Sequence, residues 1–398
     1  MASAAVIGGG VVGLCIALAL QGRGVAVTLL DAGLPQPAAS WGNAGHVAIE
    51  QVDPLASPAN IKKLPQRLFS LGGGVSFPPR AVGAWLPFGL RLLRASSHKR
   101  FSAGRHLLEG LMCEALPAWR RLTADMGRPD ILREEGHFVA WESAKSAAAG
   151  RRHWQARCPS TIGLADTSEA ELRQLRALSN NHIHDAIRFD GTAQIADPWQ
   201  LRAALENHFQ AKGGKMICRH VDDTRQIDTD YIVIAAGAAS KSLLARYGLH
   251  APLIAERGYH IACESRDWPC DMPPLVFEDR SIIVTRFASE LRVAGFVEFT
   301  RSDTPPDPEK WIRLERHMAE LGIVASQWKR WYGARPTLPD YLPAIGRSAE
   351  TPKLFYAIGH QHLGLTLAPL TGEVIAATIC GDETGSSLPD ALSLARFV

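Results

Sequence analysis

The sequence lacks cysteine pairs and any strong excess of charge of one sign. Its seven cysteines are scattered without a C-x-x-C pair, and this odd number without disulfide or metal-ligand spacing indicates free thiols in a reducing compartment. The 43 Lys+Arg residues nearly balance the 40 Asp+Glu residues, and the resulting net charge of +3 favours no nucleic acid partner. We therefore expect a cytoplasmic protein that does not bind nucleic acid. Its content of 46% hydrophobic residues excludes a disordered or fibrous chain.

The N-terminal segment lacks the features of a leader or a membrane anchor. Residues 2–22 carry no charge, whereas a signal peptide has Lys or Arg before its apolar core, and the first basic residue is Arg23. A spanning helix needs about 20 apolar residues, and three consecutive glycines at 8–10 interrupt this stretch. We expect neither export nor insertion.

A glycine-rich motif follows the first apolar run. Residues 4–7 predict a buried strand, 8–13 have G-x-G-x-x-G spacing, and 11–21 predict a helix. A second β-rich run, 25–31, ends in Asp31. This order of strand, glycine turn, helix, strand and acid is the pattern of a dinucleotide site.

Each part of this pattern has a physical task. Gly8 permits the tight turn, Gly10 lets the backbone approach a pyrophosphate, and Gly13 lets helix and strand pack closely. The helix N-terminus offers free N–H groups to phosphate. Asp31 would accept hydrogen bonds from the adenosine ribose, so the segment predicts a dinucleotide cofactor.

The order of predicted elements indicates two interleaved domains. A length of 398 residues fits about two domains of roughly 150 residues each. We predict an α/β fold in which a doubly wound Rossmann-type domain is interleaved with an α+β domain built on an antiparallel sheet. The cofactor domain is predicted to comprise residues 1–53, 190–252 and 331–398, and the substrate domain 54–189 and 253–330.

Seven motifs in order along nearly the whole chain carry a family resemblance. After the glycine motif and Asp31 they are 40–45 (SWGNAG), 191–198 (GTAQIADP), 235–237 (AAG), 257–260 (RGYH), 333–340 (GARPTLPD) and 359–366 (GHQHLGLT). Together they resemble the FAD-dependent D-amino-acid oxidase superfamily. Within it the chain is similar to the bacterial D-amino-acid dehydrogenases, in the branch acting on D-proline and cis-4-hydroxy-D-proline.

This resemblance implies FAD as the cofactor and a D-amino acid as the substrate. The reaction it implies moves a hydride from the substrate Cα to flavin N5 and leaves an imine, with the electrons passing to a quinone or dye. Two rivals stay open: an oxygen-using oxidase of the glycine or sarcosine type, and a flavin-binding subunit of a heteromeric complex.

Five side chains are the candidates for substrate handling. Arg335 has a planar guanidinium that suits a carboxylate, and relatives use the corresponding arginine in this way. Tyr259 is either a second carboxylate contact or a sheet-core aromatic. His362 is either a contact to the substrate amine or a ring hydroxyl, or a solvated loop residue, and His46 and His360 compete for similar roles. No metal site is expected.

The residues predicted to hold FAD come from six segments, and the N-terminal dipole of the last helix is expected beside the flavin. They are Gly8, Gly10, Val11, Val12, Gly13, Asp31, Ala32, Ser40, Asn43, Ala44, Gly45, His46, Ala236, Gly237, Gly333, Gly359, His360, Leu363, Gly364, Leu365 and Thr366. An adenine contact near Ile217 is left open, because the chain between 213 and 230 is shorter than in relatives.

One stretch contains no acidic residue. Residues 54–108 hold nine Lys/Arg and no Asp or Glu, together with Trp85, Phe88 and several leucines. The stretch is either a helical arm with a solvated basic face or a peripheral contact with the inner face of the cytoplasmic membrane. A quinone-linked dehydrogenase would need the second.

Overall fold

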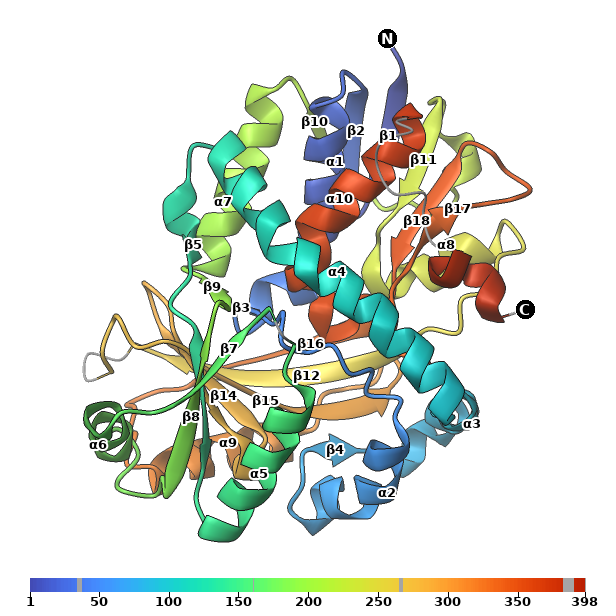
Figure 1. Cartoon of the computed structure of the whole chain (residues 1–398). Coiled ribbons are helices and arrows are strands. Elements are labelled where there is room, and N and C mark those ends of the chain that lie inside the picture. The colour runs from blue at the N-terminus through green and yellow to red at the C-terminus, as the bar shows by residue number, and fades with distance from the viewer. Residues whose placement is uncertain (34–37, 160, 265–267, 382–389, 398) are drawn as a thin grey trace.

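A mainly parallel six-stranded sheet, at the top of Figure 1, forms the first domain. The computed structural model describes residues 1–33, 38–159, 161–264, 268–381 and 390–397. The strands, in sheet order, are β10 (Lys215–Cys218), β2 (Ala26–Asp31), β1 (Ser3–Ile7), β11 (Tyr231–Ile234), β18 (Leu354–Ile358) and β17 (Ala344–Arg347). Only β17 runs antiparallel to its neighbour. The doubly wound domain predicted from the sequence is confirmed.

Four helices pack with this sheet in one apolar core. They are α1 (Val11–Gln21), α4 (His98–Asp125), α7 (Pro198–Ala211) and α10 (Gly364–Cys380), while α8 (Ser240–Ala245) belongs to a second core. Gly372 permits the close approach of α10 to α1, because a Cβ there would lie 2.5 Å from the carbonyl oxygen of Cys15. The segment Gln361–Cys380 is long and apolar enough to cross a bilayer, but 67% of it is buried in this core.

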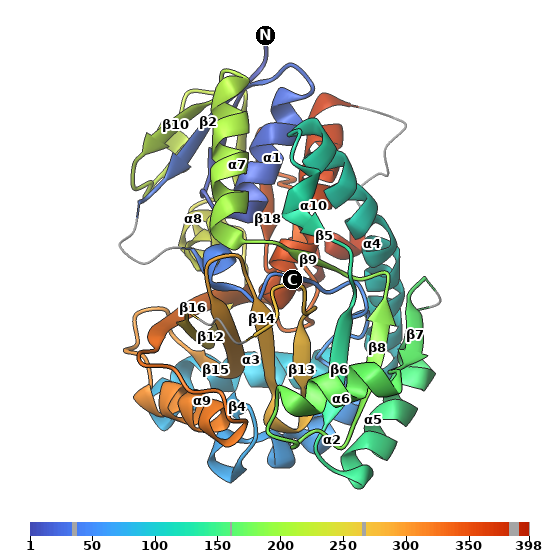
Figure 2. The same ribbon diagram turned by 90° about the vertical axis from the view of Figure 1, so that its left-hand side faces the viewer.

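A larger sheet forms the second domain. Its path is β16 (Lys329–Thr337), β12 (Ile254–Cys263), β15 (Leu291–Thr300), β14 (Ile282–Arg286), β13 (Leu275–Phe277), β6 (His137–Trp141), β8 (Asp185–Asp190) and β7 (Gly163–Asp166), with β4 (Val75–Ser76) beside β15. Figure 2 shows α9 (Pro308–Glu320) in front of this sheet and α3 (Val82–Ala95) behind it. The predicted antiparallel sheet is confirmed for β12, β15, β14 and β13, whereas β6 pairs parallel to β13 and β4 parallel to β15.

The two domains interleave as predicted, with different boundaries. The boundary placed at 331 cuts through β16, whose nine residues all pair with β12 of the larger sheet. Helix α4, assigned from the sequence to the substrate domain, packs on α10 of the other domain, and Trp119 Nε1 donates to the Leu365 carbonyl at 3.1 Å. A three-stranded sheet of β3 (His46–Val47), β9 (Ala193–Ile195) and β5 (Leu132–Arg133) completes the strands.

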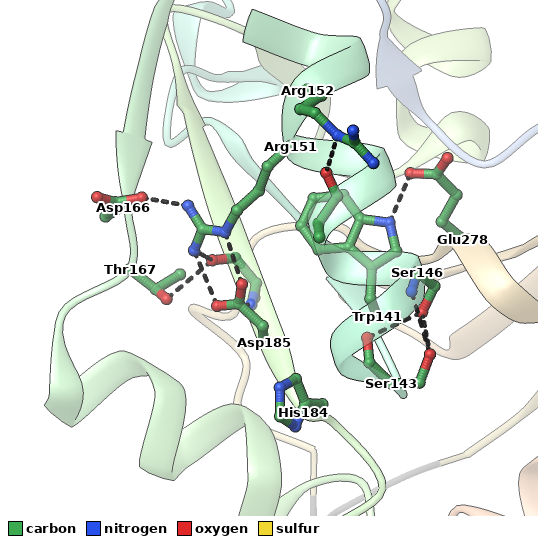
Figure 3. Close-up of polar contacts among 12 residues, drawn as sticks. Trp141, Ser143, Ser146, Arg151, Arg152, Asp166, Thr167, His184, Asp185 and Glu278 are labelled. Atoms are coloured by element: carbon green, nitrogen blue, oxygen red, sulfur yellow. Dashed lines mark hydrogen bonds and ion pairs between the residues drawn. The ribbon is translucent and has the colours of Figure 1, made fainter.

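Three further helices flank the larger domain: α2 (Pro58–Arg67), α5 (Ala144–Arg157) and α6 (Glu169–Ala177). Figure 3 shows how Arg151 ties α5 to the sheet. Its guanidinium donates to Asp185 on β8 at 2.6 and 2.8 Å and also binds Asp166 on β7. Trp141 of β6 donates to Glu278 at 3.0 Å in the same view. These contacts hold α5 against β8 and β7, the strands at this edge of the larger sheet.

Candidate functional site

A cavity of about 1040 Å³ is lined by residues of both domains. Ligand pockets usually measure about 300–1,000 Å³, so this one is large enough for a dinucleotide together with a small substrate. The predicted residues among those that line it are Gly8, Gly10, Val12, Asp31, Ala32, Ser40, Asn43, Ala236, Gly237, Gly333, Arg335, His360, His362, Gly364 and Leu365. Those not among them are Val11, Gly13, Ala44, Gly45, His46, Tyr259, Gly359, Leu363 and Thr366.

The glycine turn has the geometry that the motif requires. Gly8 has a φ of +115°, and a Cβ there would lie 2.5 Å from the Ala235 carbonyl oxygen. A Cβ on Gly13 would lie 1.9 Å from the carbonyl oxygen of Gly8, so only glycine lets α1 pack this closely on the turn. The first turn of α1 has no acidic residue, which leaves its positive dipole end available to a phosphate.

The acid at the end of β2 lies against this turn. One Asp31 carboxylate oxygen accepts from the Gly9 N–H at 2.6 Å, and the other accepts from the Gly33 N–H at 2.9 Å. Each carboxylate oxygen has a second lone pair, so the acid can also accept from a ribose hydroxyl in the cavity. Asp31 at the cavity wall can therefore serve as a hydrogen-bond acceptor for a ribose.

The 40–45 loop supports the turn from the other side. Ser40 Oγ accepts from the Val11 N–H at 3.1 Å, so this helix amide is occupied by the protein. Asn43 bridges the loop, donating to the Ser40 carbonyl at 2.6 Å and accepting from the Gly45 N–H at 2.5 Å. Arg292 of the larger sheet donates to the Asn43 carbonyl at 2.6 Å, which makes the loop a rigid link between domains.

Ile217, near which an adenine contact was left open, does not lie in the wall of the cavity. Ile217 is 45% exposed on edge strand β10 and is not among the lining residues. The residues just beyond the strand, Arg219, His220 and Val221, line the cavity there. The cavity wall at this end is therefore formed by the residues that directly follow β10.

Arg335 projects into the cavity from β16. It lies across Gly258 of β12, where a Cβ would come 2.5 Å from its Nη2. Its Nη1 is 3.5 Å from the buried carboxylate of Glu256, which in turn accepts from Thr337 at 3.1 Å and Tyr341 at 2.8 Å. Glu256 therefore orients the guanidinium while the side chain stays 27% exposed toward the cavity.

Two histidines enter the cavity from the segment before α10. Burial, and then the charge of Arg335, lower the pKa of His362 to about 4. Burial also lowers the pKa of His360 to about 4, and its Nε2 is 3.0 Å from Thr371 Oγ1. Both rings are neutral at pH 7, so each has a lone pair that can accept a proton or a hydrogen bond.

Gln361, between these histidines, is a residue that the sequence did not single out. It lines the cavity with a φ of +48°, a left-handed conformation that a non-glycine residue rarely adopts. Its Nε2 donates to the Tyr341 carbonyl, and its Oε1 has no hydrogen-bond partner among the described residues. Strained backbone of this kind concentrates at functional sites.

His46 lies in a buried polar cluster that adjoins the strand β3. Its Nε2 is 2.9 Å from Glu50 Oε1, and its ring meets that of His137 edge-on at 4.4 Å. Burial alone would raise the pKa of Glu50, but the neighbouring histidines outweigh burial and lower it to about 2. The three side chains are the one group of potential metal ligands among the described residues, with ligand atoms within 4.8 Å of one another. Glu50 was not predicted from the sequence, because no local sequence signal distinguishes a carboxylate that becomes buried in the fold.

The sequence left Tyr259 as either a substrate contact or a sheet-core aromatic, and the structure places it in the sheet core. Only 1% of it is exposed, and it packs edge-on against Trp311 at 5.4 Å. Its hydroxyl donates to Glu298 at 3.3 Å and accepts from the Asp307 N–H at 3.1 Å. Because both of its partners belong to the protein, the hydroxyl stabilises the fold.

The lining residues fit a flavin dinucleotide. Gly8 and Gly10 line the cavity beside the N-terminus of α1, where a pyrophosphate would lie, and Asp31 lines it near the position that a ribose would take. The other end of the cavity, between the Arg335 guanidinium and the start of α10, is where a flavin ring and a small carboxylate would meet. The helix end there has no acid in its first turn, so its dipole favours negative charge.

Comparisons with known proteins agree with this geometry. A model of FAD dependent oxidoreductases, the DAO family, matches residues 3–378. The D-amino-acid oxidase of Bradyrhizobium diazoefficiens is 30% identical over 95% of both chains. A D-amino acid dehydrogenase of Cereibacter sphaeroides is 26% identical, covering 99% of this chain and 95% of the relative.

Solved structures share the fold over the full chain. Glycine oxidase from Geobacillus kaustophilus superimposes with a TM-score of 0.76 at 20% identity, covering 100% of both chains. L-Proline dehydrogenase from P. horikoshii gives a TM-score of 0.70 at 16% identity, covering 100% of this chain and 97% of that one. Since the family model spans nearly the whole sequence, the chain belongs to the DAO family of FAD-dependent oxidoreductases and is an amino-acid oxidoreductase.

Proposed function

We propose that the protein is a D-amino-acid dehydrogenase acting on a small or cyclic substrate such as D-proline or cis-4-hydroxy-D-proline. The observation that carries the proposal is Arg335, a cavity-facing guanidinium held in place by Glu256 across a glycine. A planar guanidinium pairs with a carboxylate through two parallel hydrogen bonds. The names of the D-amino acid dehydrogenase and D-amino-acid oxidase relatives support the handedness.

FAD, when bound, supplies the two-electron acceptor for oxidation of the substrate Cα–N bond. Arg335 holds the carboxylate and so fixes where the Cα lies. His362 is neutral at pH 7 because burial lowers its pKa to about 4, so it can accept a hydrogen bond from the amine that must lose its proton. The N-terminus of α10 stabilises the negative charge that develops beside it.

The proposed electron acceptor is a quinone in the cytoplasmic membrane, reached from its inner face through residues 54–108. The alternative is direct use of oxygen, favoured by the name of the relative at 30% identity. A second rival is a flavin subunit that needs a partner chain for turnover. These three possibilities differ in their products and in the proteins they require.

The test is anaerobic bleaching of the bound flavin by a panel of D- and L-amino acids that includes proline and hydroxyproline. Rapid bleaching by D-proline with dye reduction and little peroxide is the expected result. Peroxide formed in step with substrate loss would establish the oxidase. Bleaching only by L-amino acids would refute the proposed handedness, and dye reduction only with an added partner would establish the subunit.

A further inference from the structure

Helix α3 is apolar on two of its faces. Its inner face, with Phe88 and Ala95 buried, packs on Phe299 and Ile254 of the larger sheet. Its outer face exposes four large side chains at 45–56%: Val82, Leu86, Leu90 and Leu93. At 100° per residue these positions fall within an arc of about 80°, so they form one stripe. A helix anchored on a sheet needs only its inner face, and scattered exposure does not produce such a stripe.

The surroundings of the stripe are strongly cationic. Residues 54–108 contain nine Lys/Arg and no Asp or Glu. Eight of these cations are exposed and form no ion pair within the described residues: Lys62, Lys63, Arg67, Arg80, Arg91, Arg94, Lys99 and Arg100. Both views place α2 at the end of the molecule away from the six-stranded sheet, and Figure 2 shows α3 behind the larger sheet (Figures 1 and 2). We call α2, α3 and these cations the basic face.

We propose that the basic face docks on an anionic lipid bilayer, with the α3 stripe inserted at the level of the headgroups. An interfacial helix buries its apolar side chains among the acyl chain ends while Lys and Arg contact lipid phosphates. Here the stripe supplies the apolar part, and Arg91, Arg94 and the lysines of α2 supply the charge. This inference deepens the proposed function by naming the surface that reaches a membrane acceptor.

The charge pattern favours lipid over a second copy of the chain. In a two-fold dimer the same patch meets itself, so the basic face would bring cations against cations with no acid between 54 and 108 to pair them. An anionic bilayer neutralises the same charges and buries the leucine side chains of the α3 stripe. The surface is thus complementary to acidic lipid.

The experiment is vesicle flotation of the FAD-loaded full chain without substrate, so that it is independent of turnover. The vesicles contain phosphatidylcholine alone or with phosphatidylglycerol, at low and high salt. The test variant combines Leu86→Ser, Leu90→Ser and Leu93→Ser, and a second variant combines Arg91→Gln and Arg94→Gln. The matched control is Val324→Ser, an 86% exposed apolar residue outside the basic face. The absorbance of bound flavin and the Tm confirm that each variant is folded.

We expect the parent chain and the control to float with phosphatidylglycerol vesicles and to be released by salt. The triple variant should lose about 100-fold in partition coefficient, since three half-exposed leucines no longer enter the bilayer. The arginine variant should bind more weakly at low salt. Absence of flotation by the parent chain overturns the proposal, as does a triple variant that floats unchanged. If the triple variant converts a dimer to a monomer without affecting flotation, the stripe is a protein interface and the proposal is also wrong.

Discussion

The guanidinium of Arg335 occupies the space that a side chain at Gly258 would fill. A Cβ at position 258 would lie 2.5 Å from Arg335 Nη2, and the two residues are on adjacent strands β12 and β16. The glycine is therefore part of the proposed carboxylate site although it offers no functional group. Arg335 keeps its position because Glu256 lies 3.5 Å from its other nitrogen.

Gly258→Ala is predicted to displace Arg335 without unfolding the protein, because the clashing atom is the end of a flexible side chain. We expect FAD to remain bound and the KM for the amino acid to rise at least about tenfold, since the guanidinium can no longer meet the carboxylate in register. Steady-state kinetics and the flavin absorbance of the purified variant measure the two effects. Gly110→Ala, at an open helical position, is the control and should leave KM unchanged.

Substitutions of Arg335 itself separate charge from geometry. Arg335→Lys keeps the charge but loses the two parallel hydrogen bonds, and Arg335→Ala loses both. We expect FAD-loaded protein in both cases, with KM raised about tenfold in the lysine variant and about 100-fold in the alanine variant. Loss of flavin from the alanine variant would contradict a substrate role and indicate that the arginine holds the cofactor.

The cofactor half of the site was predictable because its signals are local. Gly8 and Gly13 are needed where backbone approaches within 2.5 and 1.9 Å of a missing Cβ, and such requirements leave glycines at fixed spacing in the sequence. Asp31 then follows from the length of one helix and one strand. No distant contact is needed to find these residues.

The substrate half was predicted less well because its residues are set by distant pairing. Arg335 lies in a Gly/Pro-rich stretch typical of a loop, yet it pairs with Glu256 as part of a strand. All ten residues of β12 are buried, so the strand has no polar alternation to show which way Tyr259 points. Glu50 and Gln361 were missed because burial and a positive φ arise only in the folded chain.

Acid is predicted to destabilise the fold through buried histidines. Burial lowers the pKa of His137 and His260 to about 3, and of His360 and His362 to about 4. Above pH 6.5 these rings are neutral in both states. As the pH falls below 6.5 the unfolded chain binds protons that the folded chain does not, so the free energy of unfolding falls until the folded pKa values are reached.

This acid effect is measured as Tm against pH, and each ring contributes up to about 1.4 kcal/mol per pH unit in its window. His260→Gln tests one ring, since the amide can replace its hydrogen bond to the Gly42 carbonyl at 2.8 Å. The variant should show a shallower loss between pH 6.5 and 4. An identical slope would mean that His260 is protonated in the folded protein.

Asp31→Asn is predicted to weaken FAD binding while the fold is retained. The carboxylate accepts from the N–H groups of Gly9 and Gly33, and an amide can accept at only one of its two ends. One backbone donor of the glycine turn then loses its partner, and the ribose loses a charged acceptor. These losses correspond to about 1–3 kcal/mol, or a rise of about 10- to 100-fold in the Kd for FAD, measured by flavin fluorescence on titrating apoprotein. Asp130→Asn, an exposed residue paired with Arg128, is the control. An unchanged Kd would show that Asp31 only shapes the turn, whereas a higher Kd at constant Tm places the acid on the cofactor itself.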